Sequence, residues 1–428
     1  MNKLVLLSLL LALAALPAAG LAAQVYVLDV TGVIDPPTAG YVERGLETAA
    51  RAKAAAVVIR IDTPGGLMQS MRDITQDMLA SRVPVITYVW PRGARAGSAG
   101  VFITMAGNVA AMAPGTNIGA AHPVAGTGEP IESEMKRKIT NDAVAQIRAI
   151  AEERKRNAEW AEKAVRESVS ITNRQAVKLQ VVDLTAPDLG ALLRAVDGRQ
   201  VVVAGNRKVT LHTAGAEQVF LPPNFREKLL HALSDPNLAY ILLLVGVYGL
   251  IFELSNPGAI FPGVAGGICL ILAFYSLAVL PISYAGLALL LLGIGLLVAD
   301  VFATSHGVLT VGGIIAFVAG SVMLTGARGP GLAIAWPVII SAAVVTLVFF
   351  LLVVGLGVRA QFRKVTTGAE GLVGAVGVAR TDLAPEGTVM VQGELWKARA
   401  AEGKGSLAAG SRIKVLAVEG FELTVEPA

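Results

Sequence analysis

Ser98 stands among glycines and alanines in the stretch PRGARAGSAGVFITMAG, residues 91–107. Small neighbours leave a hydroxyl accessible, so this serine could be a nucleophile for acyl transfer. It could equally be a turn or helix-capping residue, which is the commoner role of a serine at such a place. Ala96 occupies the first glycine position of G-x-S-x-G, so the α/β-hydrolase motif is not supported.

A nucleophilic serine needs hydrogen-bond donors for the oxyanion that forms when it attacks a carbonyl. Ala99 follows Ser98 at the expected start of a helix, where backbone N–H groups have no partner within the helix. A second donor is expected from a glycine-rich turn at a neighbouring strand end. Gly65 and Gly66 in DTPGGL, residues 62–67, offer such a turn.

The base that would take the serine proton has two candidates. His122 in GAAHPV carries an imidazole, which is partly neutral at physiological pH and is the conventional choice. Lys138 in KRKITN acts as a base only after it loses its proton, which burial and the neighbouring charges of Lys136 and Arg137 would favour. From the residues alone, a basic surface cluster is the simpler interpretation of this lysine.

The elements around these residues alternate between strands and helices. Apolar strand patterns cover residues 25–33, 54–62 and VPVITYVW, and the stretches between them have helical spacing. A turn is expected at DPP, and TPGG is expected to end the strand that precedes it. One helix is expected over SAGVFITMAGNVAAMAP and one over residues 135–160. This alternation predicts an α/β domain of parallel βαβ units over residues 24–195.

A connector is expected after this domain, over residues 196–237, with a small hairpin from Val201. Residues 238–358 contain only three charged side chains, Glu253, Asp300 and Arg328, and therefore predict an all-α membrane domain.

About five spans are expected in this membrane domain, and two of them are marginal in length. The expected spans are residues 238–254, 260–280, 285–302, 308–324 and 333–357. Five crossings would take the chain from an exported N-terminal domain to a cytoplasmic C-terminus. The positive charges of Arg359, Arg363 and Lys364, just after the last span, agree with this by the positive-inside rule.

Residues 1–23 have the basic start, apolar run and small-residue end of a signal peptide, so the α/β domain is expected on the exported side. Cys269 is the single cysteine, which excludes a disulfide within the chain. The net charge of +4 is spread along the chain, which argues against nucleic-acid binding. Neither the spacing of a metal site nor a phosphate-binding loop is present, so no metal or cofactor is expected.

The tail, residues 364–428, contains five short strand patterns separated by glycines. This spacing is typical of a small closed β-barrel of the OB type. Trp396 and Phe421 are its only aromatic residues after Phe362, too few for a base-stacking surface.

Several motifs occur in the order DTPGG, RAGSAG, MAPGTNIGAAHPV and KITN, followed by YGLIFELSNPG and a final LTVEP. With the signal peptide, the spans and the small barrel, this order resembles the NfeD-type membrane-bound serine proteases of the Clp-protease/crotonase superfamily. The resemblance covers almost the whole chain and implies a Clp/crotonase-like fold for residues 24–195.

The resemblance also implies roles for individual residues. Ser98 would be the nucleophile and Lys138 the general base of a Ser–Lys dyad, with the N–H groups of Gly66 and Ala99 forming the oxyanion hole. His122 would line the site, and it stays open as an alternative base.

The same resemblance implies a homodimer or higher homo-oligomer in the inner membrane, in contact with lipid. It would cleave apolar segments of stomatin-, prohibitin- or flotillin-like partners. Two other functions remain open from the sequence: a non-enzymatic membrane scaffold, and an acyl-CoA enzyme, which export argues against.

Overall fold

The computed structural model describes residues 23–124, 133–255, 260–280, 282–303, 305, 307–325, 333–361, 369–403 and 405–428. The expected signal peptide, apart from Ala23, lies outside these ranges, as do Arg363 and Lys364. The chain divides into two compact units, one formed by residues 1–300 with 304–347 and the other by 301–303 with 348–428. Each is described by itself below.

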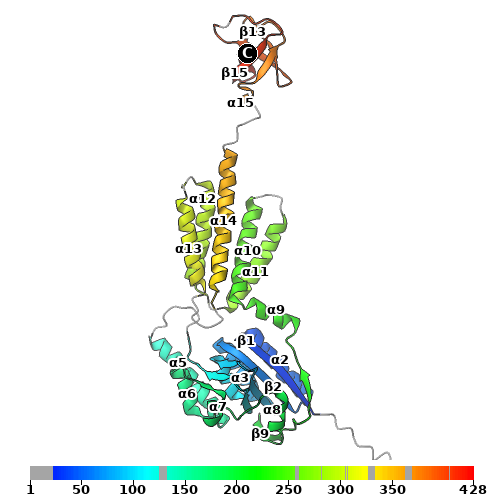
Figure 1. Ribbon diagram of the computed structural model, residues 1–428, viewed down its shortest axis with the longest axis vertical. Helices are drawn as coiled ribbons and strands as arrows, with labels where there is room; N and C mark the ends of the chain where they lie inside the picture. The colour runs from blue at the N-terminus through cyan, green and yellow to red at the C-terminus, as the bar shows by residue number, and fades with distance from the viewer. Residues whose placement is uncertain are drawn as a thin grey trace, which may run out of the picture. The chain divides into compact units, whose positions relative to one another are not determined.

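The first unit begins with the α/β domain that the sequence predicts (Figure 1). Strands β1 (Gln24–Ile34), β2 (Ala56–Gly66) and β3 (Val85–Val89) pair in parallel, joined by helices α2 (Pro36–Arg51) and α3 (Met68–Ala80). DPP is not a free turn, because Asp35 caps α2 and the two prolines form its first turn.

Six further strands complete a nine-stranded sheet. The order is β7-β6-β4-β2-β3-β5-β8, with β1 beside β2 and β11 beside β1, and all these pairs are parallel except β6 with β7. The additional strands are β4 (Arg95–Gly97), β5 (Val109–Met112), β6 (Asn117–Gly119), β7 (Ser170–Thr172), β8 (Leu184–Thr185) and β11 (Glu217–Phe220).

Strand β2 is longer than the sequence predicts, because TPGG continues it instead of ending it. Its first half pairs with β1 and β3, but β3 ends at Val89, and β4 takes the place beside β2 with Ala96 opposite Thr63. The glycines stay in the strand because β1 remains paired with them up to Ile34. The motifs DTPGGL and RAGSAG are thereby brought together at one end of β2.

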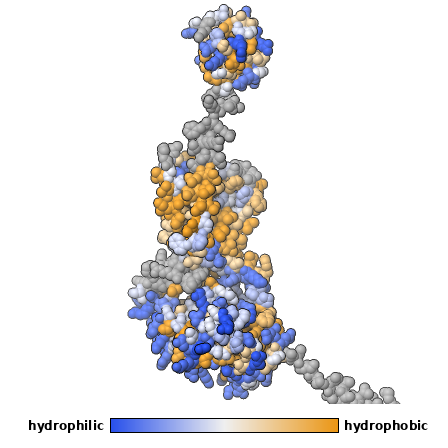
Figure 2. All heavy atoms as spheres, viewed as in Figure 1, coloured by the Kyte–Doolittle hydropathy of each residue, from blue (hydrophilic) through white to orange (hydrophobic). Residues whose placement is uncertain are grey.

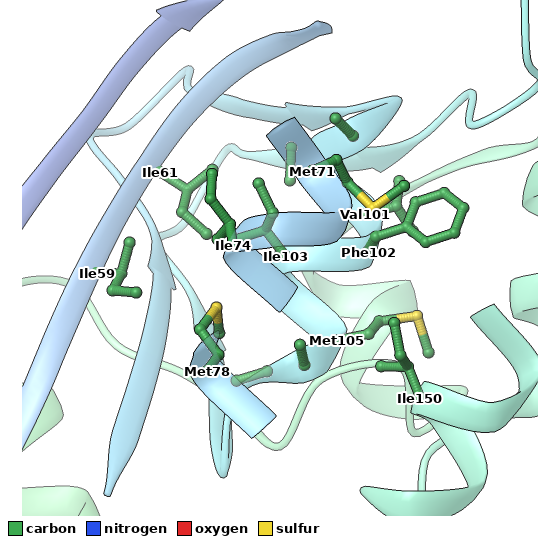
Figure 3. Close-up of a cluster of buried hydrophobic side chains, with 14 of the residues drawn as sticks. Ile59, Ile61, Met71, Ile74, Met78, Val101, Phe102, Ile103, Met105 and Ile150 are labelled. Carbon is green, nitrogen blue, oxygen red and sulfur yellow. The ribbon is translucent and has the colours of Figure 1, made fainter. Parts of the chain in front are cut away.

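A tightly packed apolar core fixes the helix that follows Ser98. Helix α4 (Ala99–Ala106) is buried over its whole length. Its side chains Val101, Phe102, Ile103 and Met105 meet residues of β2, α3 and α5 (Figure 3). A helix surrounded on all sides by packed side chains has little freedom to shift, so the residue at its start is held in place.

Two expected helices are shorter than the sequence indicates. The helix expected over residues 98–114 ends at Ala106, and Val109–Met112 form strand β5 beside β3. The helix expected over residues 135–160 is divided into α5 (Ser133–Glu153) and α6 (Ala158–Arg166), with Asn157 capping α6. Helices α7 (Asn173–Lys178) and α8 (Leu189–Val196) follow.

The stretch predicted as a β-rich connector contains the expected hairpin, formed by β9 (Gln200–Val203) and β10 (Arg207–Thr210). It also supplies β11 to the edge of the main sheet, beside β1. Helix α9 (Phe225–Leu233) then packs against α2 and leads into the membrane helices.

Five apolar helices follow: α10 (Pro236–Ser255), α11 (Ile260–Val279), α12 (Tyr284–Phe302), α13 (Val308–Leu324) and α14 (Trp336–Gln361). Among the described residues α10, α11 and α12 are long and apolar enough to span a membrane, whereas α13 and the apolar part of α14, Trp336–Leu352, are shorter. Apolar side chains dominate the visible surface of this region (Figure 2). The number of crossings remains a prediction.

The second unit contains the small barrel that the sequence predicts. Its five strands close in the order β12-β13-β14-β16-β15 around one apolar core, with β14 parallel to β16. The strands are β12 (Val376–Ala379), β13 (Glu386–Val391), β14 (Glu394–Ala400), β15 (Arg412–Glu419) and β16 (Glu422–Pro427). The short helix α15 (Ala369–Leu372) precedes them.

One buried charge holds the corner between α5 and α6 against the sheet. The side chain of Arg156 is 3% exposed and donates to Asp183 at 2.9 Å and to the carbonyl oxygen of Gly107 at 3.0 Å. Burial lowers the pKa of this guanidinium, so the charge depends on these acceptors.

We expect Arg156→Ala to lower the free energy of unfolding by about 2 kcal/mol, because it removes the hydrogen bonds of a buried guanidinium to Asp183 and to the carbonyl oxygen of Gly107. Arg51→Ala is the matched control: it removes an exposed ion pair with Glu47 and should change stability by less than about 1 kcal/mol. Urea unfolding of the detergent-solubilised chain measures both. Equal effects of the two substitutions would contradict this account of the corner.

Candidate active site

Ser98 occupies the sharp turn between β4 and α4. Its backbone angles are φ 50° and ψ −112°, which non-glycine residues rarely adopt and which are unfavourable by about 1–3 kcal/mol. Ser98 is the N-cap residue of α4, but its side chain makes no capping hydrogen bond to the helix, so its hydroxyl does not serve as a cap. The turn is fixed by two backbone hydrogen bonds, from the Ser98 N–H to Gly119 at 3.1 Å and from the Val101 N–H to Ser98 at 3.0 Å.

Gly65 lies directly against this serine. Its φ of +120° is accessible essentially only to glycine. A Cβ atom at this position would lie 2.5 Å from the Cβ of Ser98 and 3.0 Å from its Oγ. The lack of a side chain at Gly65 is therefore what allows the end of β2 to meet the serine.

Gly66 lies against the end of β1, which also pairs with β2. A Cβ atom here would lie 2.1 Å from the carbonyl oxygen of Ile34, at the end of β1. Ile34 pairs with Gly66, and its carbonyl accepts the N–H of Leu67 at 2.8 Å. Gly66 can therefore lie beside the end of β1 only because it has no side chain.

Thr63 organises the same strand end, a role that the motif DTPGGL did not reveal. Its buried hydroxyl donates to the carbonyl oxygen of Gly32 at 2.6 Å and accepts the N–H of Gly65 at 3.0 Å. The Thr63 hydroxyl thus links β1 to the N–H of Gly65. A threonine separated from a glycine pair only by Pro64 was the available signal.

Ala99 is the first residue of α4, as the sequence predicts. The N–H at this position has no acceptor within the helix, and the partial positive charge of the helix start adds to it. Gly65 borders this nitrogen, because a Cβ on Gly65 would lie 3.5 Å from it. The structure thus gathers Ser98, the Ala99 N–H and the Gly65–Gly66 strand end in one place.

Lys138 is not brought to Ser98 within this single chain. It lies on α5 with its side chain 67% exposed, and its Nζ pairs with the carboxylate of Glu134 at 3.2 Å. A general base must lie within hydrogen-bond reach of the hydroxyl that it deprotonates, so this arrangement is not that of a base.

The rest of α5 is firmly attached. Arg72 of α3 forms an ion pair with Asp142 and donates to Gln146 at 3.2 Å. These contacts lie beside a groove of about 540 Å³ between α3 and α5. From Ala143 onward the helix has buried residues, whereas Ser133–Asp142 carry no buried side chain. Lys138 therefore lies on the uncovered part of the helix.

His122 lies just after β6, half-buried, with its Nδ1 2.8 Å from the carbonyl oxygen of Val165 on α6. A carbonyl can only accept, so Nδ1 donates in this hydrogen bond. The bond fits the site-lining or structural role expected from the sequence and leaves Nε2 uninvolved in it. The geometry leaves both interpretations of His122 open.

Comparison with known proteins matches three family models to successive parts of the chain. Residues 24–192 match the NfeD1b N-terminal domain, residues 237–356 the NfeD integral membrane domain, and residues 369–427 the NfeD-like C-terminal, partner-binding domain. The membrane-bound protease PH1510 of Pyrococcus horikoshii is 35% identical over 94% of this chain and 92% of its own length. The chain belongs to the NfeD family.

A second NfeD relative, membrane protein NfeD1b of Bacillus subtilis, is 30% identical over 94% of this chain and 92% of its own length. With its matched membrane domain and its apolar helices, this NfeD protein is an integral membrane protein.

Solved structures match parts of this NfeD chain. One is a stomatin-specific membrane-bound protease domain, described as an alanine variant of a lysine in complex with a substrate peptide. It is 35% identical, with a TM-score of 0.47, over 50% of this chain and 99% of its own. Another is the C-terminal domain of a stomatin operon partner protein from Pyrococcus horikoshii, 37% identical, with a TM-score of 0.14, over 14% of this chain and 95% of its own.

The strained turn gives a prediction that does not depend on activity. Ser98→Gly should raise the free energy of unfolding by about 1 kcal/mol or more, because glycine adopts φ 50° without strain. Ser98→Ala also removes the hydroxyl but keeps the strain, so it should show no such gain. Urea unfolding of the two variants isolates the backbone effect; equal stabilities would mean that the turn is not strained.

Proposed function

We propose that this NfeD protein is a membrane-bound serine endopeptidase that uses Ser98 as its nucleophile. The observation that carries the proposal is the position of Ser98: a strained turn at the start of a buried helix, with a glycine pair against its side chain. A serine held in this way without a capping bond has no evident structural use for its hydroxyl. The name of the related PH1510 chain, a membrane-bound protease, supports the same activity.

In the proposed reaction, Ser98 Oγ attacks the carbonyl carbon of a peptide bond while a base takes its proton. The carbonyl oxygen becomes an oxyanion, which the N–H groups of Gly66 and Ala99 stabilise. The proton then passes from the base to the leaving amine, and the carbon–nitrogen bond breaks. Water hydrolyses the acyl-enzyme by the same steps and releases the serine.

We assign the base role to Lys138, which completes a Ser–Lys dyad. This assignment requires the lysine to leave Glu134 and to become covered, because an amine accepts a proton only in its neutral form. The uncovered part of α5, Ser133–Asp142, is where a bound peptide or a second copy of the chain would provide that cover. A homodimer or higher homo-oligomer is therefore part of the proposal.

The proposed substrates are apolar segments of stomatin-, prohibitin- or flotillin-like membrane proteins. A protease domain 35% identical to this chain is described as stomatin-specific, and we extend that substrate class to this chain. We also propose that the α/β domain lies on the exported side of the inner membrane, in contact with lipid at its membrane helices, and that the barrel is cytoplasmic. The barrel matches a partner-binding domain, so it is the proposed docking point for these partners.

A second candidate is a non-enzymatic scaffold of stomatin-like assemblies. The specific observation in its favour is the exposed Lys138 with its carboxylate partner. In this alternative the α/β domain binds partners without cleaving them.

A fluorophosphonate probe distinguishes the two candidates. We expect it to label the full-length protein in membranes and to leave Ser98→Ala unlabelled, since labelling requires an activated hydroxyl. Cleavage of a stomatin-derived apolar peptide should fall by about 10⁴-fold or more in Ser98→Ala. An unlabelled wild type that binds the peptide but does not cleave it would favour the scaffold.

Matched substitutions of the two candidate bases test the dyad. Lys138→Ala should lower kcat for this peptide by about 10³-fold, whereas His122→Ala should leave a readily measurable rate. Lys136→Ala is the control for loss of a positive charge on the same helix and should have little effect. The reverse pattern for Lys138 and His122 would transfer the base role to the histidine.

A further inference from the structure

Helix α9, which immediately precedes the first membrane helix, is attached to the α/β domain at both of its ends. At its start Glu227 accepts two hydrogen bonds from Arg44 of α2, at 2.6 and 2.8 Å, and Asn224 caps the helix. At its end His231 lies 2.7 Å from the carboxylate of Asp35 through its Nδ1. Only two residues separate the end of α9 from α10.

The carboxylate of Asp35 is almost fully buried and serves two elements. One oxygen accepts the N–H and the hydroxyl of Thr38, at 2.9 and 2.5 Å, and so caps α2. The other oxygen faces His231. Removing the histidine would leave that oxygen in a buried setting without its partner, which is unfavourable.

Asp35 directly follows Ile34, the residue whose backbone pairs with Gly66. The ring of His231 also borders the other end of this short segment, since a Cβ on Gly32 would lie 3.8 Å from its Nε2. The carbonyl oxygen of Gly32 in turn accepts the hydroxyl of Thr63. The segment Gly32–Asp35 is thus bordered by α9 on one side and by the glycine strand end on the other.

We propose that His231 is a positioning residue for the Gly66 peptide: its bond to Asp35 fixes the segment Gly32–Asp35, and through it the strand end beside Ser98. The proposal rests on the proposed function for its effect on catalysis. It makes the membrane region a regulator of the site, because a movement of α10 acts on α9 directly. A partner that binds the membrane helices would in this way change the rate of peptide cleavage at Ser98.

The contact also depends on pH. The hydrogen bond that the His231 ring donates to the carboxylate of Asp35 raises the pKa of His231 above its ordinary value. Because the pKa is raised, the extra stability that the charged ring gives this contact is fully present below about pH 6.5 and is lost as the pH rises through the raised value. The titratable or charged groups around the ring are Asp35, Asp29, Tyr41, Glu227, Lys228 and Asp235.

Hydrogen exchange on the full-length protein in detergent tests the positioning role without any need for activity. In His231→Ala, amides of residues 63–67 should exchange at least about tenfold faster, with those of β5 unchanged. His231→Asn keeps a donor near the position of Nδ1 and should restore protection. Arg226→Ala, on the same helix, is the control. Unchanged exchange of residues 63–67 in His231→Ala would overturn the proposal.

Peptide cleavage as a function of pH tests the consequence for catalysis. His231→Ala should lower kcat about tenfold with little change in KM. His231→Asn should keep kcat and lose the decline at higher pH that His231 contributes. If exchange changes while neither wild type nor variants cleave the peptide, the positioning role stands and the proposed endopeptidase fails. If His231→Ala cleaves like the wild type at every pH, the coupling to catalysis is overturned.

Discussion

The close approach of three backbones at Gly65 and Gly66 is the constraint on which the rest of the site depends. Gly65 meets the turn that carries Ser98, and Gly66 meets the end of β1 at Ile34. Side chains at these positions would overlap with atoms on both sides, so the two contacts can coexist only with glycine. The site proposed at Ser98 depends on that approach.

The buried core makes this approach reproducible. Helix α4 is packed on all sides and begins directly after Ser98, so the energy of many apolar contacts offsets the unfavourable angles of that one residue. Thr63 adds a directional contact, because its hydroxyl joins β1 to the peptide of Gly65. By contrast, Lys138 lies on the uncovered part of α5, where no comparable packing fixes it. The proposed nucleophile is thus held in place, whereas the proposed base lies on a part of α5 that carries no buried side chain.

The same strand end links the site to the membrane part of the chain. Ile34 contacts Gly66, Asp35 follows it, and His231 reaches Asp35 from α9. Backbone pairing and one part-buried hydrogen bond therefore link α9, which precedes α10, to the strand end that carries the proposed oxyanion donor.

The sequence alone determined the α/β domain, the apolar helices and the five-stranded barrel, because alternation, hydropathy and glycine spacing are local properties. It also singled out Ser98, Ala99 and the glycine pair from their neighbours in the chain. The sequence did not predict two features that depend on pairing partners distant in the chain. TPGG stays in β2 because β1 and β4 flank it, and Val109–Met112 form a strand because β3 is beside them. Only the tertiary structure joined His231 to Asp35, which lie 196 residues apart, and only it showed that Lys138 faces solvent in the single chain.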